Sequence, residues 1–456
     1  MTASAVLTAI EPDGLPPSQR RWAFMAQAIV ITMAVLDGSI ANIALPSIAG
    51  DLHIQPADSI WVINSYQLAV VVSLLPLASL GDIYGYRRVY AWGIALFTAA
   101  SLACALSTSL TMLTISRVVQ GFGAAGLMSV NTALVRFIFP RAELGRGMGL
   151  NGLIVAVAAA AGPSLAAGIL TVAQWPWLFF VNVPIGLVAV AMTRTLPMTP
   201  LAAHRFDWRS AALNGLMFGL FIAGVDGFGH GQQRLLIGVE LVGAALVGVI
   251  FVRSQMRLRA PILPVELFAI PVFALSVLTS VCSFVAASMA FVAMPFLFEA
   301  NGLSTIDTGL LITPWPVTSA IVAPIAGRLS DRVSAGKLGG VGLLLLCVGL
   351  AAIASIPPQA SWLNVAWRMM LCGAGFSLFQ APNNRLLIAS TPRERSGAGS
   401  GVLSSARLLG QTLGAALVAV VFGVTAGIAA GATTAIWIGA GAALLAMMVS
   451  ILRVRA

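Results

Sequence analysis

Long runs of apolar residues, separated by short clusters of glycine, proline and charged residues, follow one another along nearly the whole chain. Each run is about as long as the 20 residues that a helix needs to cross a bilayer. The runs lack the alternation of apolar and polar positions that a membrane β-barrel requires. The pattern predicts an all-α polytopic membrane protein with fourteen transmembrane helices, at residues 22–46, 59–80, 89–107, 110–136, 146–171, 177–195, 209–230, 235–254, 271–298, 305–327, 338–356, 362–386, 397–426 and 432–452.

The composition agrees with a chain that crosses the bilayer many times. Of its 456 residues, 59% are hydrophobic and 9% are charged, whereas soluble domains carry about 25% charged residues. The net charge of +10 comes mainly from arginines in short connections between the apolar runs. This charge therefore reflects membrane topology and predicts no nucleic-acid partner.

The basic residues also predict the orientation of the chain. They occupy every second connection and both ends, and the other connections hold almost none except Arg234. Because Lys and Arg favour the cytoplasmic side, we expect both termini in the cytoplasm and an even number of spans. The clusters are Arg20-Arg21, Arg87-Arg88, Arg136/Arg141/Arg146, Arg194/Arg205/Arg209, Arg253/Arg257/Arg259, Arg328/Arg332/Lys337, Arg385/Arg393/Arg395 and Arg453/Arg455.

The cysteines, the histidines and the nucleotide-binding motifs bear on which classes of function are possible. The four cysteines lie in apolar runs and the three histidines are isolated, so the sequence predicts no disulfide, no metal site and no Cys/His catalytic centre. No Walker A sequence occurs, so we expect no ATP-driven chemistry and no cofactor. The first 19 residues lack the features of a signal peptide and are expected to form a cytoplasmic tail.

Asp37 in the first predicted span and Arg117 in the fourth are charged residues well inside apolar runs. Arg368 in the twelfth and Arg407 in the thirteenth are further candidates, with a structural role or a place near the cytoplasmic end as the alternative. An ionised carboxylate in a bilayer costs at least about 2.5–3.5 kcal/mol on insertion scales and is rare unless it faces a bundle interior or a wet cavity. Asp37 therefore indicates a site that titrates a proton or binds a cation. The alternative is a structural aspartate satisfied by a neighbouring helix. Arg117 likewise needs a partner or a wet cavity.

Two motifs recur at a similar offset along the chain. The loop from Asp82 to Arg88 closes the second span, and Asp331-Arg332 stands at the corresponding place after the tenth. Arg117 and Arg368 occupy matching places in the fourth and twelfth spans. These repeated motifs predict two homologous six-helix halves. In transporters built from such repeats, the substrate site lies at the midplane between the halves. The predicted parts are a tail (1–21), the first half (22–195), a linker (196–208), two inserted helices (209–254), a linker (255–270), the second half (271–452) and a tail (453–456).

These motifs, in this order, resemble the fourteen-helix drug:proton antiporter family of the major facilitator superfamily. The resemblance covers essentially all of the chain after residue 20. Ile83 departs from the family by replacing a basic residue, which could weaken a gate in the loop that follows. The segments that carry the resemblance are Leu36 to Pro46, Trp61 to Tyr66, the Asp82/Gly85/Arg87/Arg88 loop, Arg117 to Gly121, Gly162-Pro163, Trp175 to Gly186 and Ser405 to Gly410.

The resemblance implies a monomeric exporter in the bacterial inner membrane that works by alternating access. It implies that hydrophobic, cationic compounds leave in exchange for protons, with Asp37 as the proton carrier and Arg117 as its partner. It also implies that Gly162 and Pro163 form the kink associated with exporters. Tight helix packing is the plain alternative for these two residues.

The resemblance further implies a cytoplasmic gate, in which Asp82 pairs with a cation near Gly85, Arg87 and Arg88. The alternative is a turn that fixes topology. Asp331 and Arg332 would form the matching gate in the second half.

Other residues are candidates for substrate binding. Trp61 and Tyr66 could line an adaptable apolar pocket, although most such residues are ordinary packing or an interfacial belt. Asp226 and Glu299 lie near predicted outer ends and could receive a cationic substrate. Two other functions stay open: an exporter or symporter of one specific metabolite, and a non-transport membrane sensor or enzyme, for which the sequence offers no catalytic cluster.

Overall fold

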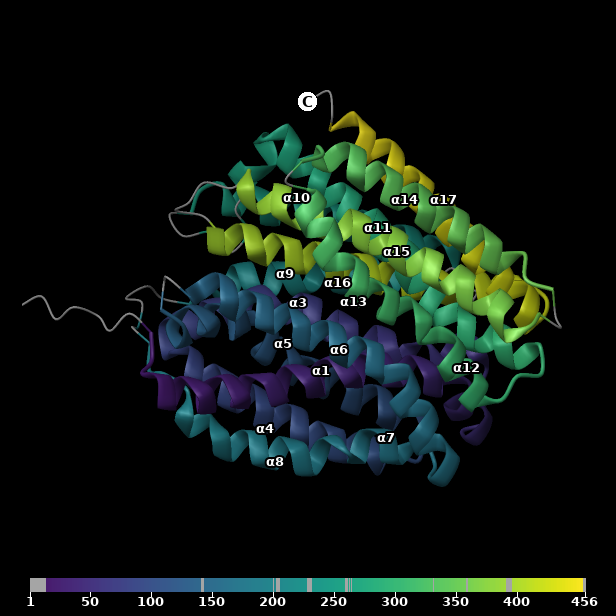
Figure 1. Cartoon of the computed structure of the whole chain (residues 1–456), viewed down its shortest axis with the longest axis horizontal. Coiled ribbons are helices and arrows are strands. Elements are labelled where there is room, and N and C mark those ends of the chain that lie inside the picture. Colours follow the sequence, from purple (N-terminus) through teal and green to yellow (C-terminus); the bar gives the residue numbers. More distant parts are fainter. Residues whose placement is uncertain are drawn as a thin grey trace, which may run out of the picture.

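The regular structure in the described part of the chain is helical (Figure 1). The computed structural model describes residues 14–140, 143–199, 201, 206–227, 232–258, 261, 263, 265–330, 332–357, 360–390 and 396–453. The first half forms α1 (Pro17–Asp51), α2 (Pro56–Ser59), α3 (Trp61–Tyr84), α4 (Tyr86–Ala105), α5 (Leu110–Ile138), α6 (Leu144–Val172), α7 (Pro176–Phe180), α8 (Asn182–Met192) and η2 (Thr193–Thr195).

The middle and the second half of the chain continue the pattern. The inserted pair is α9 (Trp208–Gly227) and α10 (Arg234–Gln255), followed by the short η3 (Val265–Ala269). The second half forms α11 (Pro271–Ala300), α12 (Thr305–Ile312), α13 (Pro314–Leu329), α14 (Ala335–Ala354), α15 (Trp362–Ala389), α16 (Ser396–Val424) and α17 (Ile428–Leu452).

Every predicted span coincides with one helix or with consecutive helices. Twelve helical segments in the described residues are long and apolar enough to cross a membrane. The predicted fourth and twelfth spans are α5 and α15, with 29 and 28 residues, and they are absent from that set of twelve. Each contains an arginine, Arg117 or Arg368, which lowers its hydropathy. Fourteen membrane crossings therefore stay a prediction.

Proline explains where one predicted span is divided. The tenth span is split between α12 and α13 at Thr313, directly before Pro314 at the first position of α13. Proline is tolerated at that position because the amide would lack a helical partner anyway. The helices before and after this break, α12 and α13, both contact α6.

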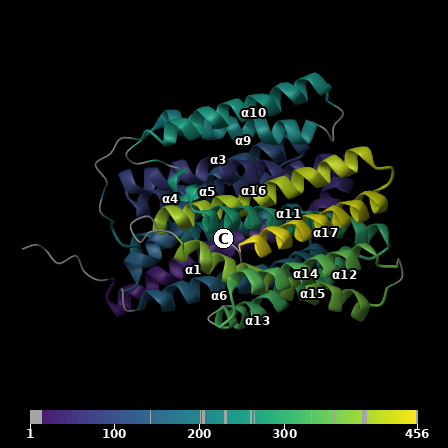
Figure 2. The same cartoon turned by 90° about the horizontal axis from the view of Figure 1, so that it is seen from above.

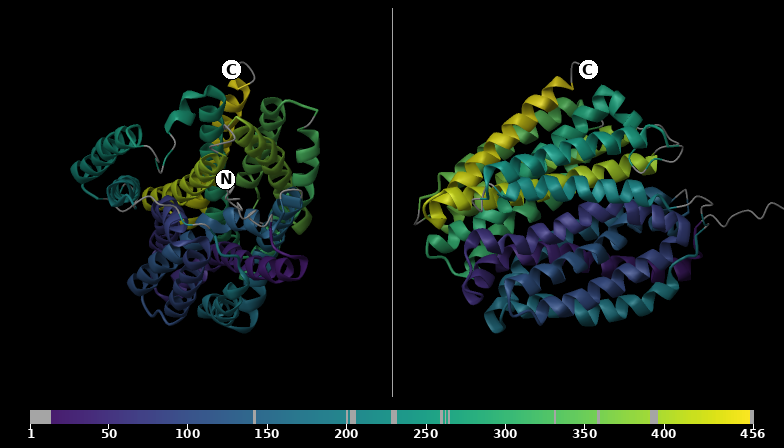
Figure 3. Two further views of the ribbon diagram at one scale, coloured as in Figure 1. Left: turned by 90° about the vertical axis from the view of Figure 1, so that its left-hand side faces the viewer. Right: turned by 180° about the vertical axis from the view of Figure 1, so that it is seen from behind.

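The two halves lie as two layers, with the purple-to-blue first half below the green-to-yellow second half in Figure 1 and the same division from behind in Figure 3. Figure 2 shows α9 and α10 along one edge of the bundle, next to α3 and α16. The Asn214 side-chain amide of α9 donates to the Val72 carbonyl of α3 at 2.8 Å. The inserted pair is thus attached to the first half through α9.

The interface between the halves has the symmetry that the repeats predict. The second span (α3) packs against the thirteenth (α16), and the tenth span (α12–α13) packs against the fifth (α6). The repeat relates the second span to the tenth and the fifth to the thirteenth. The two contacts are therefore equivalent under exchange of the halves, as expected for parallel repeats related by a two-fold axis.

The hydrophobic core is continuous between the halves at one end only. Residues 40–48 near the end of α1 share one buried cluster with residues 285–298 near the end of α11. At the opposite end, a second cluster contains residues 23–33 of α1 and further residues of the first half. Leu408 of α16 belongs to it, and a residue of α9 packs against it. A small separate cluster there contains Leu267, Phe273, Leu387 and Val402 of the second half. The halves are therefore joined where α1 and α11 end.

Glycine allows close helix packing inside the second half, and this can be tested. A Cβ atom at Gly342 of α14 would lie 2.6 Å from the Gly375 carbonyl oxygen and 2.7 Å from the Phe379 nitrogen of α15. Both are backbone atoms that cannot turn aside, and overpacking costs about 1–3 kcal/mol. We expect Gly342→Val to lower the apparent melting temperature in detergent. Gly441→Val in α17, where nothing lies within 4 Å of the added atom, is the matched control, and equal melting of the two variants would contradict the packing argument.

Candidate functional site

The Asp37 carboxylate is buried at the meeting point of three helices of the first half. Its side chain is about 1% exposed. Oδ2 accepts a hydrogen bond from Arg117 Nη1 of α5 at 2.7 Å. Oδ1 accepts from Gln120 Nε2 of α5 at 2.9 Å and from Asn182 Nδ2 of α8 at 2.8 Å. The predicted pair of Asp37 with Arg117 is thus formed, with two amides completing it.

The Arg117 guanidinium makes hydrogen bonds and ring contacts with residues of several helices. Its Nε donates to the Val62 carbonyl of α3 at 2.9 Å, and Nη1 also donates to Gln120 Oε1 at 2.6 Å. Its guanidinium carbon lies 4.1 Å from the centre of the Tyr66 ring and 5.5 Å from that of Phe179. A cation over an aromatic face gains further stabilisation when both are desolvated. The guanidinium therefore links α1, α3 and α5 through one group.

The hydrogen bonds of the Asp37 cluster show which groups donate and which accept. Arg117, Gln120 and Asn182 all donate to the Asp37 carboxylate, and an ionised carboxylate can only accept hydrogen bonds. The carboxylate and the guanidinium neutralise each other, which a buried pair requires. Three donors occupy three of the roughly four lone-pair sites of the carboxylate, which leaves Oδ2 able to accept a further hydrogen bond or a proton.

A model of the Major Facilitator Superfamily matches residues 28–278 and 276–456, which is nearly the whole chain. The chain belongs to the major facilitator superfamily. An uncharacterized transporter of Escherichia coli K12, YebQ, is 53% identical over 88% of this chain and 89% of its own length. Multidrug resistance protein Stp of Mycobacterium tuberculosis is 32% identical over 85% of this chain and 73% of its own.

Solved structures show the same fold. A bacterial homologue of the human lysosomal transporter Spinster, in an inward-facing and unoccupied conformation, has a TM-score of 0.70 at 16% identity, covering 97% of this chain and 98% of that chain. The protein is thus a major facilitator transporter with several membrane spans and is not an enzyme.

The predicted substrate-binding residues of this major facilitator protein do not all meet at Asp37. Tyr66 does, through its contact with Arg117. Trp61 is half-buried at the first position of α3 and, in the described part of the chain, makes no hydrogen bond or ring contact with the cluster. Glu299 lies at the end of α11, where one oxygen accepts from Thr305 Oγ1 at 3.1 Å. The Asp226 side chain is outside the described residues.

The predicted gate loop holds a different contact from the one expected. Asp82 Oδ1 accepts from the Tyr86 hydroxyl at 2.6 Å, and within the described residues it forms no ion pair with Arg87 or Arg88. Gly85 joins α3 to α4 with a φ of 92°, a conformation that favours glycine. In the second half, Arg332 is exposed and Asp331 lies outside the described residues.

Gly162 and Pro163 lie at a three-helix contact. A Cβ atom on Gly162 would lie 2.5 Å from the Ser39 Cβ of α1. The Pro163 carbonyl oxygen would lie 2.7 Å from a Cβ on Gly309 of α12. Tight packing, the alternative given for these residues, is present and includes a contact between the halves, and the exporter-associated role stays a prediction.

Gln120 and Asn182 are the functional candidates that the sequence analysis did not single out. Gln120 follows Arg117 by three positions and so shares its helix face, which was an available signal. Asn182 begins α8, directly after the break at Val181. Nothing in the sequence alone says that this break turns the amide toward α1.

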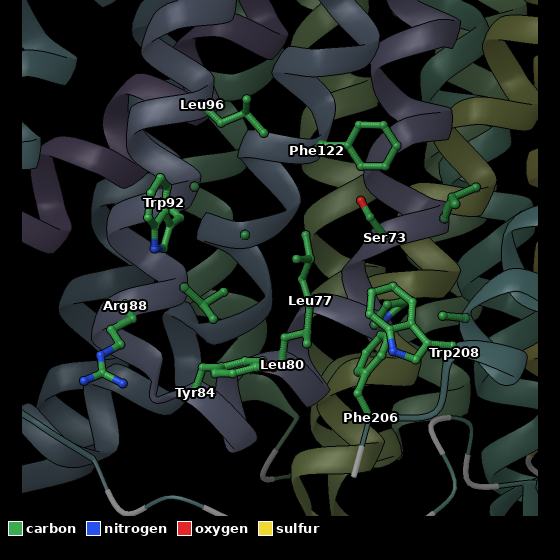
Figure 4. Close-up of a pocket in the computed structure, with 16 residues that line it drawn as sticks. Ser73, Leu77, Leu80, Tyr84, Arg88, Trp92, Leu96, Phe122, Phe206 and Trp208 are labelled. Carbon is green, nitrogen blue, oxygen red and sulfur yellow. The ribbon is translucent and has the colours of Figure 1, made fainter.

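A lateral groove lies outside the Asp37 cluster (Figure 4). Its volume is about 590 Å³, and its walls come from α3, α4, α5 and the start of α9. Its only charged lining residue is Arg88, and Trp92 and Trp208 are strongly exposed at it. Such aromatics are typical of membrane–water interfaces. The groove contains neither Asp37, Arg117 nor Tyr66 and is separate from the buried site.

Proposed function

We propose that this transporter exports hydrophobic compounds across the bacterial inner membrane in exchange for protons, as a multidrug-type efflux protein. The observation that carries the proposal is the buried Asp37–Arg117 pair with its two amide partners. An ionisable group inside a membrane bundle is a functional candidate by default. The relative named as a multidrug resistance protein supports export of this kind.

Asp37 carries the proton in this scheme. When the carboxylate is ionised, Arg117, Gln120 and Asn182 hold α1, α5 and α8 together. When a proton neutralises it, the charge–charge attraction to Arg117 is lost and the hydrogen bonds from its donors weaken. Because these donors come from different helices, proton binding can bias one arrangement of the first half over another.

Alternating access of the two halves would complete the cycle. The halves share a core where α1 and α11 end, while the cluster of the first half at the opposite end includes only Leu408 from the second. With both termini cytoplasmic, as the arginine pattern predicts, this arrangement opens toward the cytoplasm. The likeness to an inward-facing structure supports that assignment.

The Asp82 loop fits a gate in its released state. Its carboxylate bonds to Tyr86, which belongs to the same half, and Arg87 and Arg88 are not ion-paired to it. A gate that closes the cytoplasmic side would need a partner from the other half. The proposal also includes the direction of transport, because Gly162-Pro163 are associated with export by resemblance. It further includes a monomeric state.

The test is transport by purified protein in liposomes under an imposed pH gradient. The panel is rhodamine 123, ethidium and fluorescein, and internal pyranine reports proton movement. We expect dye efflux that depends on the gradient and moves protons the opposite way. Dye movement that is equal with and without a gradient would contradict proton coupling. Transport of one narrow metabolite and no dye would favour the specific-metabolite alternative.

Asn182 offers a second test of the coupling cluster. Asn182→Leu removes one charge-assisted hydrogen bond to Asp37, and such bonds contribute about 1.5–3 kcal/mol. We expect gradient-driven transport to fall about tenfold or more, with protons leaking when substrate is absent. Asn214→Leu, a buried asparagine that bonds only to α3, is the control. A larger transport loss in the control would show that Asn182 acts only through folding.

A further inference from the structure

Arg407 is an unpaired cation in the middle part of a membrane helix. It lies well inside α16, and its side chain is half-buried. Among the residues that the structure describes, its guanidinium makes no hydrogen bond and no ion pair, and its Nε is buried without a partner. Uncompensated charge at such depth is costly and rare. This arginine therefore needs an explanation that packing does not supply.

The faces of α16 locate Arg407 between the two halves. Gly410 and Gly414 pack against α11, where added Cβ atoms would lie 2.6 and 2.7 Å from the Val281 carbonyl oxygen and the Ser288 Cβ. Gly401 faces Leu75 of α3 instead. Helical periodicity places Arg407 between these two faces, in the wedge between α3 and α11.

Arg407 lies near the cluster formed by Asp37, Arg117, Gln120 and Asn182. Arg407 interacts electrostatically with the phenol of Tyr66, whose ring covers Arg117. Leu408, the next residue, packs in the same cluster as Tyr66. Arg407 is thus a second charge beside the Asp37 site, contributed by the other half of the protein.

Unpartnered amides face the same wedge from α3. Asn64 is fully buried, and neither its amide nitrogen nor its amide oxygen has a partner in the described structure. The Gln67 Oε1 atom is also buried without one. Helical spacing puts Asn64, eleven residues before Leu75, on the face that carries Leu75 toward α16, and Gln67 is turned about 80° from that face. Buried polar atoms are almost always paired, so the Asn64 amide is a group that can hydrogen-bond to a bound compound.

The charge balance decides what kind of ligand fits. Asp37 is the only buried acid among the described side chains, and Arg117 neutralises it. Arg407 therefore leaves the site with a surplus positive charge, and a cationic substrate finds no free acid there. The cationic substrate predicted from the sequence gains no support from these residues.

We propose that Arg407 binds the substrate and that the exported compound carries an anionic group, such as a carboxylate, on a hydrophobic body. This inference rests on the proposed export function. A guanidinium can donate two parallel hydrogen bonds to a carboxylate. The side-chain amides of Asn64 and Gln67 supply further donors and acceptors for the compound.

The test compares two xanthene dyes of opposite charge, anionic fluorescein and cationic rhodamine 123, in transport and in binding by fluorescence polarisation. We expect wild type to prefer fluorescein, Arg407→Gln to bind and export it at least about tenfold less well, and Arg407→Lys to keep the preference. Arg407→Glu should reverse it. Arg368→Gln is the control, because that arginine already donates to the Ala352 carbonyl at 2.9 Å.

The outcomes separate this inference from the proposed function. Gradient-driven export of rhodamine 123 alone, unchanged in Arg407→Gln, would leave proton-coupled export standing and overturn the anionic substrate. Binding of fluorescein that Arg407→Gln leaves unchanged would overturn it as well, whether or not transport occurs. Arg407-dependent fluorescein binding without any gradient-driven flux would support the anion site and contradict the proton coupling. Thermal melting of each variant in detergent shows that it is folded.

Discussion

Replacing Asp37 with asparagine reduces pH-gradient-driven transport to the rate of protein-free liposomes. Asparagine keeps the size of the side chain but cannot exchange a proton or balance the charge of Arg117. The guanidinium, about 1% exposed, then lacks its counter-charge, and the attraction between α1 and α5 no longer changes with pH. We expect Asp37→Asn to retain exchange of labelled for unlabelled substrate across the membrane, since that requires no net proton movement.

The two readouts distinguish coupling from folding. Gradient-driven efflux and substrate exchange are measured on the same liposomes, with protein insertion checked by protease protection. Glu240→Gln is the matched control, because Glu240 lies on α10, away from the cluster, with its Oε1 accepting from Gln232 at 3.2 Å. Normal gradient-driven transport in Asp37→Asn would show that Asp37 is structural, and the proton carrier would then be sought at Asp226 or Glu299.

The arrangement of helices was largely readable from the sequence. Apolar runs of membrane-spanning length have few alternatives, and their predicted limits agree with helices such as α5, which ends at Ile138 where residue 136 was expected. Charge in a bilayer is similarly restrictive, so Asp37 and Arg117 could be picked out as a pair. The all-α fold follows from the same regularities, whereas the superfamily was expected from the resemblance of the ordered motifs and is confirmed by the family match.

The partners of each charge could not be read in this way. Hydropathy does not report which way a side chain points, so Asn182 of α8 was not assigned to Asp37. The sequence also suggested an ion pair for Asp82, whereas the adjacent Tyr86 hydroxyl satisfies it. Arg117 and Arg407 both lie inside apolar helices, and the sequence does not show that Arg117 has an acidic partner whereas the Arg407 Nε has none in the described structure. This difference is set by tertiary packing.

A covalent bridge between the halves is expected to stop transport. The Ser164 hydroxyl of α6 and the Thr313 hydroxyl between α12 and α13 lie 2.8 Å apart, in the contact that includes Gly309 and Pro163. Both side chains are half-buried and belong to opposite halves. If alternating access separates the halves at this end, a bridge here fixes the arrangement seen in the structure.

The experiment uses Ser164→Cys/Thr313→Cys treated with a short bifunctional thiol reagent whose bridge a reductant cleaves. We expect transport to fall to background after treatment and to recover after reduction. Asn131→Cys/Asn151→Cys is the control, because these side chains are hydrogen-bonded at 3.3 Å within the first half and are therefore not parted when the two halves separate. The untreated variants and the wild type, with its four cysteines, are treated in parallel. Full transport by a protein shown to be bridged would mean that α6 and α12 stay together throughout the cycle, so that substrate passes by a movement other than separation of the halves at this contact.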